Sequence, residues 1–188
     1  MTKSHSRRRF VRTGFALALG ATASQPGWAA SARPSFDSVD EIARLAFLNT
    51  HTGEKLDVVY REGRRYLADA LAEIDRLLRD HRSGDVHEID RTLLDQLARL
   101  QGLLDVGKRP FHVISGYRSP RTNAALAARS RGVATRSLHL QGRAVDVRMP
   151  GLELRTLHRA ALSMQAGGVG HYARSNFVHL DTGRVRRW

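Results

Sequence analysis

The chain has 188 residues, no cysteine and a formal net charge of +13, with 41% apolar and 6% aromatic residues. The absence of cysteine excludes disulfides and thiolate zinc sites, and the length fits one compact domain behind a short N-terminal segment. A basic chain can bind nucleic acid, anionic lipid or an acidic polymer, but no nucleic-acid-binding motif is present, so we expect no nucleic-acid partner.

The first 32 residues have the pattern of an export signal. A basic segment, 6–12, precedes a short apolar stretch, 13–21. This stretch is shorter than the roughly 20 apolar residues that span a membrane, so we expect cleavage and no stable membrane anchor. The pair Arg7 and Arg8, followed closely by Phe10, predicts export into the periplasm by the twin-arginine translocase. The general secretory route is the alternative.

Cleavage near residue 30 would leave a basic mature protein. Small residues at 30–32 and at 27–29 offer two competing cleavage sites. We assign 1–32 to the signal peptide, 33–40 to a polar linker and 41–188 to the folded domain. Residues 1–32 contain five basic and no acidic residues, so 26 basic and 18 acidic residues remain, a net charge of +8.

The domain alternates irregularly between strand and helix patterns. Two apolar strands flanking a turn at 50–54 predict a β-hairpin over 42–60. Leucines at helical spacing then predict core-facing helices over 67–78 and, after Ser83 and Gly84, over 93–104. The remaining predicted elements are a strand at 111–114, helices at 122–130 and 152–164, and strands at 143–148 and 177–181. We expect an α+β fold with a mainly antiparallel β-sheet and helices packed on one side.

Two of the predicted strands carry polar residues on one face. In 143–148 the valines alternate with Ala144 and Asp146, and in 177–181 His179 and Asp181 lie opposite the apolar residues. Gly142 permits a tight turn just after His139. Side by side, these strands would bring His139, Asp146 and His179 together as a three-ligand zinc site with an open fourth position, typical of catalytic zinc. The alternative is a surface or capping histidine and an ordinary strand carboxylate.

A third motif points to a family. The segment Ser115-Gly116-Tyr117-Arg118-Ser119-Pro120 follows an apolar strand and precedes a helix, and the His139-to-Asp146 and His179-to-Asp181 motifs come after it. This order over roughly 40–188 resembles the M15-type zinc peptidases, and most closely their murein endopeptidase K-like branch. The resemblance implies a Hedgehog/DD-peptidase-like fold.

The same resemblance implies an activity. It predicts a hydrolase that uses one Zn²⁺ per chain to cleave peptide cross-links in peptidoglycan, with stem peptides as its partners. A basic surface suits this carboxylate-rich polymer, although it could also be an ordinary solvated face. The alternatives are a D-alanyl-D-alanine carboxypeptidase and a non-catalytic peptidoglycan-binding scaffold.

The resemblance also suggests residue roles. It makes His139, Asp146 and His179 the zinc ligands and assigns Arg118 to the substrate near the scissile bond, where a guanidinium can hold a carboxylate or an oxyanion. Arg118 could instead tie down its own turn. Ser115 and Tyr117 are further substrate-binding candidates, or they only shape this turn.

The general base is less clear from the sequence. Carboxypeptidase relatives have a Glu three residues before the last ligand, where this chain has Asn176, and an amide cannot accept the proton. Asp181 and His171 are the remaining candidates. Asp181 could instead orient His179, a common arrangement at zinc-binding histidines. His171 could be a loop residue that only lines the pocket.

Overall fold

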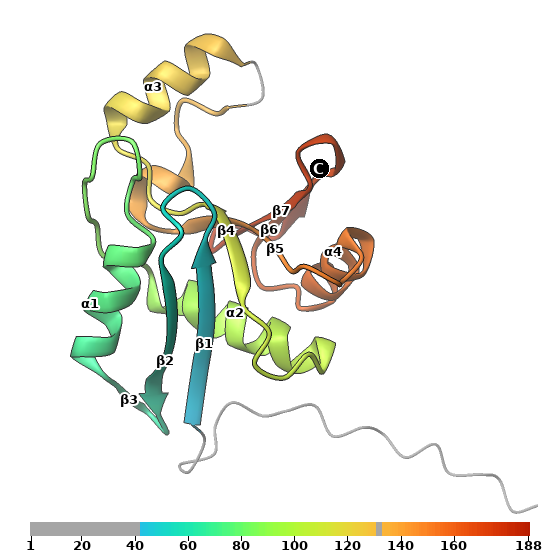
Figure 1. Cartoon of the computed structure of the whole chain (residues 1–188). Coiled ribbons are helices and arrows are strands. Elements are labelled where there is room, and N and C mark those ends of the chain that lie inside the picture. Colours follow the sequence, from blue (N-terminus) through green and yellow to red (C-terminus); the bar gives the residue numbers. More distant parts are fainter. Residues whose placement is uncertain (1–41, 131–132) are drawn as a thin grey trace, which may run out of the picture. The chain divides into compact units, whose positions relative to one another are not determined.

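The computed structural model describes residues 42–130 and 133–188. The predicted signal peptide and linker lie outside these residues. The described strands are β1 (Ile42–Asn49), β2 (Lys55–Glu62), β3 (Arg65–Tyr66), β4 (Phe111–Ser115), β5 (Ala144–Arg148), β6 (Gly168–Tyr172), β7 (Phe177–Asp181) and β8 (Arg186–Arg187). The α-helices are α1 (Ala68–Leu77), α2 (Arg91–Leu104), α3 (Pro120–Arg129) and α4 (Leu154–Ser163), and two short 3₁₀ turns are η1 (Leu138–Gln141) and η2 (Ala173–Ser175) (Figure 1).

The eight strands form one sheet in the order β3-β2-β1-β4-β5-β7-β6-β8. Only the β1–β4 and β6–β8 pairs are parallel, so the predicted α+β class with a mainly antiparallel sheet is confirmed. The predicted hairpin is β1 and β2. Because β4 and β5 lie between this hairpin and β7, the sheet brings residues from distant parts of the sequence side by side.

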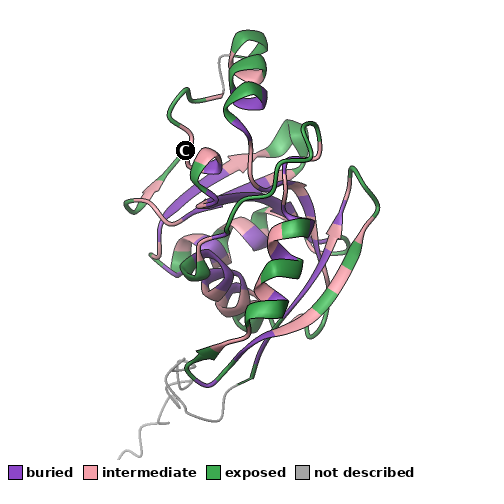
Figure 2. Ribbon diagram, turned by 90° about the vertical axis from the view of Figure 1, so that its left-hand side faces the viewer, coloured by how far each residue is buried: buried purple, intermediate pink, exposed green. Residues whose placement is uncertain are grey.

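Three helices share one hydrophobic core with the sheet. Ile74 on α1, Leu97 on α2 and Leu157 on α4 are almost completely buried and pack in the same cluster as the strand residues Val145 and Val178. Both predicted leucine stripes therefore face the core. Figure 2 shows these helices gathered on one side of the buried central strands. The opposite faces of β5 and β7 are thus free to carry a polar site.

The helix α3 departs from this arrangement. Its buried residues are the polar Thr122 and Asn123, none of its residues joins the hydrophobic core, and it projects from the sheet in Figure 1. The expectation that helices pack on one side therefore holds for α1, α2 and α4 but not for α3. Among the helices of the described residues, none is long and apolar enough to cross a membrane.

The glycine-rich segment before β7 is a strand, β6, for which the sequence predicted no element. It pairs along its length with β7. Glycine has a low strand propensity, but a side chain at Gly168 would have its Cβ only 2.4 Å from Nη1 of Arg186 and 2.5 Å from Oδ2 of Asp181. Glycine is thus required by the close approach of these two side chains.

Candidate metal centre

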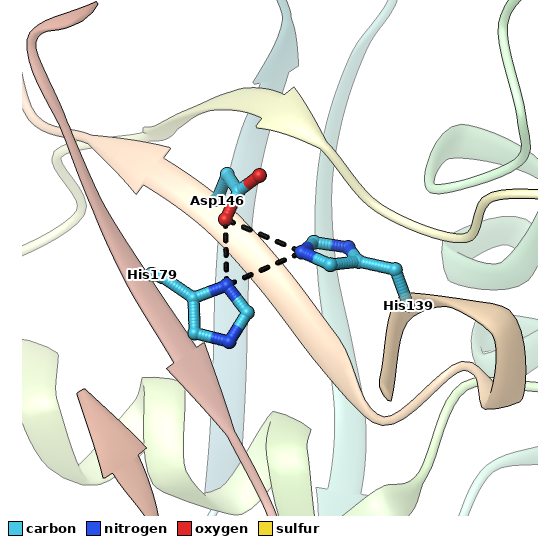
Figure 3. A group of neighbouring side chains, drawn as sticks. All are labelled: His139, Asp146 and His179. Carbon is cyan, nitrogen blue, oxygen red and sulfur yellow. Dashed lines mark hydrogen bonds and ion pairs between the residues drawn. The ribbon is translucent and has the colours of Figure 1, made fainter. Parts of the chain in front are cut away.

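Three side chains from different elements meet at one point. His139 comes from η1, Asp146 from β5 and His179 from β7 (Figure 3). Nδ1 of His179 lies 2.8 Å from Oδ1 of Asp146 and 3.2 Å from Nε2 of His139, and Nε2 of His139 lies 3.3 Å from the same carboxylate oxygen. All three residues are buried, and together they form a group that could hold a metal ion.

Strand pairing explains two of these three positions. Asp146 on β5 lies directly opposite His179 on β7 in an antiparallel ladder. Directly paired residues point to the same face of a sheet, so the two side chains are adjacent. Their neighbours Val145 and Val178 point to the core on the opposite face. The expected alternation of apolar and polar residues along both strands is confirmed.

His139 is brought to the same face by the tight turn of η1. The turn ends at Gly142, which has a φ of 64° and whose Cβ, if present, would lie 2.1 Å from the carbonyl oxygen of Glu88. Both the left-handed backbone and the lack of space require glycine here. Ser137 caps the turn, since its hydroxyl accepts a hydrogen bond from the backbone N–H of His139.

The outward ring nitrogens of both histidines face hydrogen-bond acceptors. Nδ1 of His139 lies 2.7 Å from the carbonyl oxygen of Gly116, and Nε2 of His179 lies 3.0 Å from Oδ2 of Asp181. A carbonyl oxygen can only accept, so Nδ1 of His139 carries the proton. His179 lies between two carboxylates, with Nε2 3.0 Å from Oδ2 of Asp181 and Nδ1 2.8 Å from Oδ1 of Asp146, so both nitrogens can donate when the ring is protonated. Nε2 of His139 then presents a lone pair to the centre, and Nδ1 of His179 does so when its ring is neutral and protonated on Nε2, as in zinc-binding histidines whose other nitrogen is hydrogen-bonded.

This donor set fits a small divalent cation. With both histidines neutral, two imidazole nitrogens and a carboxylate oxygen converge on one point, which a metal ion or a proton on His179 can occupy. Nη2 of Arg118 also lies 3.2 Å from Nε2 of His139. A tetrahedral zinc ion with ligand distances of about 2.0–2.2 Å places neighbouring ligand atoms roughly 3.3–3.6 Å apart. The separations of 2.8–3.3 Å observed among these three atoms are slightly shorter.

The electrostatics of the group also favour a cation. Burial would raise the pKa of Asp146, but the neighbouring His139 and His179 outweigh this effect and hold it well below its usual value. Burial lowers the pKa of His139. Burial also acts to lower the pKa of His179, but hydrogen bonds to Asp146 and Asp181 raise it overall. A metal ion would therefore compete with a proton at His179.

Asp181 lies behind His179 and is completely buried. Its two oxygens accept five hydrogen bonds, from the His179 ring, from the backbone N–H groups of Gly168 and Gly183, and from two nitrogens of Arg186. Burial would raise the pKa of Asp181, but the hydrogen bonds from His179 and Arg186 lower it well below its usual range. This carboxylate has no free lone pair directed at the metal centre.

Arg118 lies on the other side of the group. Its Nη2 donates to Oδ2 of Asp146 at 2.5 Å, and its Nε donates to the hydroxyl of Ser115 at 2.8 Å. The backbone of its turn is tied down as well, because the N–H of Tyr117 donates to Leu78 and that of Arg118 to His139. The structure thus places Arg118 and Ser115 beside the predicted ligands.

The buried side chain of Asp80 holds the end of the turn that carries Arg118. It accepts hydrogen bonds from the backbone N–H and the hydroxyl of Ser119, at 2.9 Å and 2.7 Å, and from the backbone N–H of Arg82. Burial would raise the pKa of Asp80, but hydrogen bonds from Thr122, Ser119 and Arg82 hold it well below its usual value. A carboxylate therefore fixes the start of α3 next to Arg118.

A cavity of about 170 Å³ opens beside the three predicted ligands. Its lining combines arginines, aromatic rings and the loop before η1. The lining residues are Arg118, Val133, Ala134, Arg136, Ser137, Leu138, His139, Asp146, Tyr172, Phe177, His179, Asp181, Arg186 and Trp188. A larger hollow of about 450 Å³, which includes Arg61 and Asp95, contains none of the predicted site residues.

Two predicted site residues are not brought to this group. His171 pairs with Val178 on the core-facing side of β7, and its ring lies 4.8 Å from that of His158 on α4, so it faces away from His179. Tyr117 stacks on His87 at 4.7 Å and does not line the cavity. Asn176 is exposed and has a φ of 52°, a left-handed conformation that Asn adopts more readily than most residues.

Sequence reasoning missed several residues around the centre. Gly116 supplies the carbonyl for His139, and Arg186 holds Asp181 by two hydrogen bonds. Trp188 has its ring 5.2 Å from that of His179 and donates from Nε1 to the hydroxyl of Tyr172. The one available signal was a conspicuous Arg-Arg-Trp sequence at 186–188, close to the predicted last ligand.

Comparisons with known proteins identify the family. A family model described as peptidoglycan L,D-endopeptidase MepK matches residues 37–188. The peptidoglycan L,D-endopeptidase MepK of Escherichia coli (strain K12) is 50% identical over 144 residues, which cover 77% of this chain and 79% of the relative. The probable peptidoglycan L,D-endopeptidase MepK of Haemophilus influenzae is 40% identical over 144 residues, or 77% of each chain. The chain therefore belongs to the M15-type peptidase family described as peptidoglycan L,D-endopeptidase MepK.

Proposed function

We propose that this protein is a zinc-dependent peptidoglycan L,D-endopeptidase, which hydrolyses cross-links between stem peptides. The observation that carries the proposal is the group of three inward-facing acceptor atoms beside a cavity. Family membership and the names of the relatives agree with this activity. We further propose that residues 41–188 form a Hedgehog/DD-peptidase-like domain.

Nε2 of His139, Oδ1 of Asp146 and Nδ1 of His179 are the proposed ligands of one zinc ion per chain. Three ligands leave a coordination position for a reactant, as in catalytic zinc sites. When bound, zinc is a Lewis acid that activates water near neutral pH and polarises a peptide carbonyl. The protein's own contribution is to hold these three atoms in place through Gly116, Asp181 and the β5–β7 ladder.

Arg118 is the proposed substrate-contacting residue. Its Nη2 and Nε are held by Asp146 and Ser115, while its Nη1 has no hydrogen-bond partner within residues 42–130 and 133–188. This nitrogen can donate to the carbonyl oxygen of the scissile bond as negative charge develops on it. Ser115 then acts on the substrate only through Arg118.

Asp181 is proposed as a positioning residue that acts through His179. Its five hydrogen bonds hold it in an ionised state directed at the far nitrogen of the ring, an arrangement that fixes the ring and increases its basicity toward a metal. We leave His171 out of the proposed catalytic group because it faces the core side of the sheet.

For cellular location we propose export to the periplasm by the twin-arginine route, with residues 1–32 removed. The basis is the sequence pattern around Arg7 and Arg8, since these residues lie outside the described part of the chain. A route that exports folded proteins would let the protein bind its metal before export. Peptidoglycan would then be its accessible polymer.

Incubation of the metal-loaded mature protein with purified peptidoglycan tests the proposal. Mass spectrometry should show L,D-cross-linked dimers converted into monomers, and a His139→Ala variant should release nothing. Loss of only terminal alanine from monomers would favour the carboxypeptidase. Binding to sacculi without new fragments, despite full zinc loading, would favour the scaffold.

A further inference from the structure

The cavity beside the metal centre has an excess of positive charge. Three guanidinium groups line it, from Arg118, Arg136 and Arg186, against two carboxylates, from Asp146 and Asp181. A divalent cation on the proposed ligands would increase the excess further. Low-dielectric walls strengthen the field of such charges, so the cavity favours an anionic group on whatever it binds.

Two of the three guanidinium groups already have acidic partners. Arg118 is hydrogen-bonded to Asp146, and its side chain is 13% exposed. Arg186 donates to both oxygens of Asp181, at 3.0 Å and 2.6 Å. If either arginine turned away to an external anion, its buried carboxylate would lose a charged partner, which is unfavourable. The charge of each arginine is thus already balanced by an acidic partner, although Nη1 of Arg118 can still donate a hydrogen bond to the substrate carbonyl.

Arg136 is different. It is exposed, and within the described ranges 42–130 and 133–188 it has no hydrogen bond, ion pair or ring contact. It precedes Ser137, whose hydroxyl caps the turn that holds His139, so its backbone is fixed close to the metal centre. A guanidinium that is solvated and unpaired can take up a carboxylate without breaking an existing contact.

The rest of the lining suits the aliphatic part of a peptide. Tyr172 and Phe177 stack with ring centroids 4.5 Å apart, and Trp188 is hydrogen-bonded to the Tyr172 hydroxyl. Aromatic side chains provide apolar contact area with little loss of conformational entropy. The cavity thus combines an apolar surface with one uncommitted cation.

We propose that Arg136 forms a carboxylate subsite that binds a free carboxylate of the substrate next to the scissile bond. This inference rests on the proposed function and specifies its substrate class. The preferred substrates are cross-linked stem peptides in which the cross-linking diamino acid keeps a free carboxylate. The same peptides with that carboxylate amidated are poorer substrates, because an amide carries no charge for the guanidinium to pair with.

The test compares two cross-linked dimers that differ only in this carboxylate or carboxamide. For Arg136→Gln, kcat/KM on the carboxylate dimer should fall roughly 10- to 100-fold, mainly through KM, as expected for a lost hydrogen bond to a charged group. On the amidated dimer it should change less than about twofold. Arg136→Lys should retain part of the preference, because Lys keeps the charge but not the planar fork.

Arg174→Gln is the matched control. Arg174 is also an exposed arginine, in η2, but it does not line the cavity, so its loss should leave both dimers unaffected. Metal content and melting temperature of every variant should equal those of the wild type. Equal rates for wild type and Arg136→Gln, or an equal loss on both dimers, would overturn the carboxylate subsite.

A separate outcome would overturn the proposed function instead. If the fully metal-loaded wild type cleaves neither dimer, calorimetric binding of the intact dimers still tests the subsite. Tighter binding of the carboxylate dimer by the wild type, lost in Arg136→Gln, would support the subsite without the activity. Absence of binding to either dimer would contradict both proposals.

Discussion

Asp181→Asn is the substitution that separates a positioning residue from a general base. Asn has the same shape as Asp, but an NH₂ group replaces one of the oxygens that together accept five hydrogen bonds. In either orientation of the amide, at least two of the five hydrogen-bond donors would then point at the NH₂ group, which cannot accept from them. If His179 is one of them, its ring loses the contact that orients it toward Asp146.

The expected magnitude follows from these contacts. A hydrogen bond to a charged group contributes about 1.5–3 kcal/mol, and Arg186 can recover part of its loss because its side chain is 34% exposed. We therefore expect the unfolding free energy to fall by about 2–4 kcal/mol, which lowers the melting temperature by roughly 5–15 °C. Loss of an orienting partner should weaken metal affinity by about 10- to 100-fold.

Thermal unfolding and chelator competition measure both effects. With zinc in large excess, Asp181→Asn should regain most of its turnover, because the reacting atoms are intact once the metal is bound. Arg186→Gln is the control: it removes the arginine but leaves the carboxylate on His179, so its metal affinity should fall by less. A different result would refute the positioning role: Asp181→Asn with the metal affinity and stability of the wild type, but with turnover about 100-fold or more lower under full zinc loading.

Three further outcomes are expected. Replacing both Arg7 and Arg8 with Lys should cause precursor to accumulate in the cytoplasm, seen by fractionation, and normal processing would contradict the twin-arginine route. Gly142→Ala should lower the unfolding free energy by roughly 3 kcal/mol or more, and Gly53→Ala by only about 1–2 kcal/mol. Both glycines have a positive φ, but only Gly142 lacks space for a Cβ, so equal losses in denaturant titrations would contradict this. Because folding lowers the pKa of Asp80, its ionised side chain stabilises the folded protein fully above about pH 4, and this stabilisation is lost as the pH falls below that value. Asp80→Asn should therefore flatten the acid side of the curve of unfolding free energy against pH, and an unchanged slope would refute this.

The strand patterns predicted most of the metal centre because alternation is a local property. In β5 and β7 every second residue is apolar, so the face that carries Asp146 and His179 could be read from each segment alone. Strand register decides whether these two residues lie directly opposite each other. The sequence pattern constrains this register only if the apolar faces of both strands must pack into the same core. In this fold they pack into the same core, because Val145 of β5 and Val178 of β7 belong to one hydrophobic cluster.

Other features depended on contacts between distant residues and could not be predicted from the pattern. No strand was predicted for the glycine-rich segment of β6, and the side chains that explain a glycine at 168, those of Asp181 and Arg186, come from other parts of the chain. The orienting contact of His139 comes from Gly116, 23 residues away in the sequence, whereas Asp181 lies close to the last ligand on β7, His179, and was already a candidate to orient it. The polar buried residues of α3 gave no apolar stripe that would have revealed its projection from the core.

The register of β6 against β7 determines which histidine can take part in the chemistry. Gly170 pairs with His179, so His171, one position further on, points to the core side and meets His158. A shift of one residue would exchange the two faces and bring an imidazole beside the proposed zinc ligands, but it would also move Gly168 away from Asp181 and Arg186. Since any larger residue at Gly168 would collide with these two side chains, the network that orients His179 also fixes the register that keeps His171 out of the site. This is why we propose Arg118 for the stabilisation of developing charge and Asp181 for the positioning of His179, and give His171 no catalytic role.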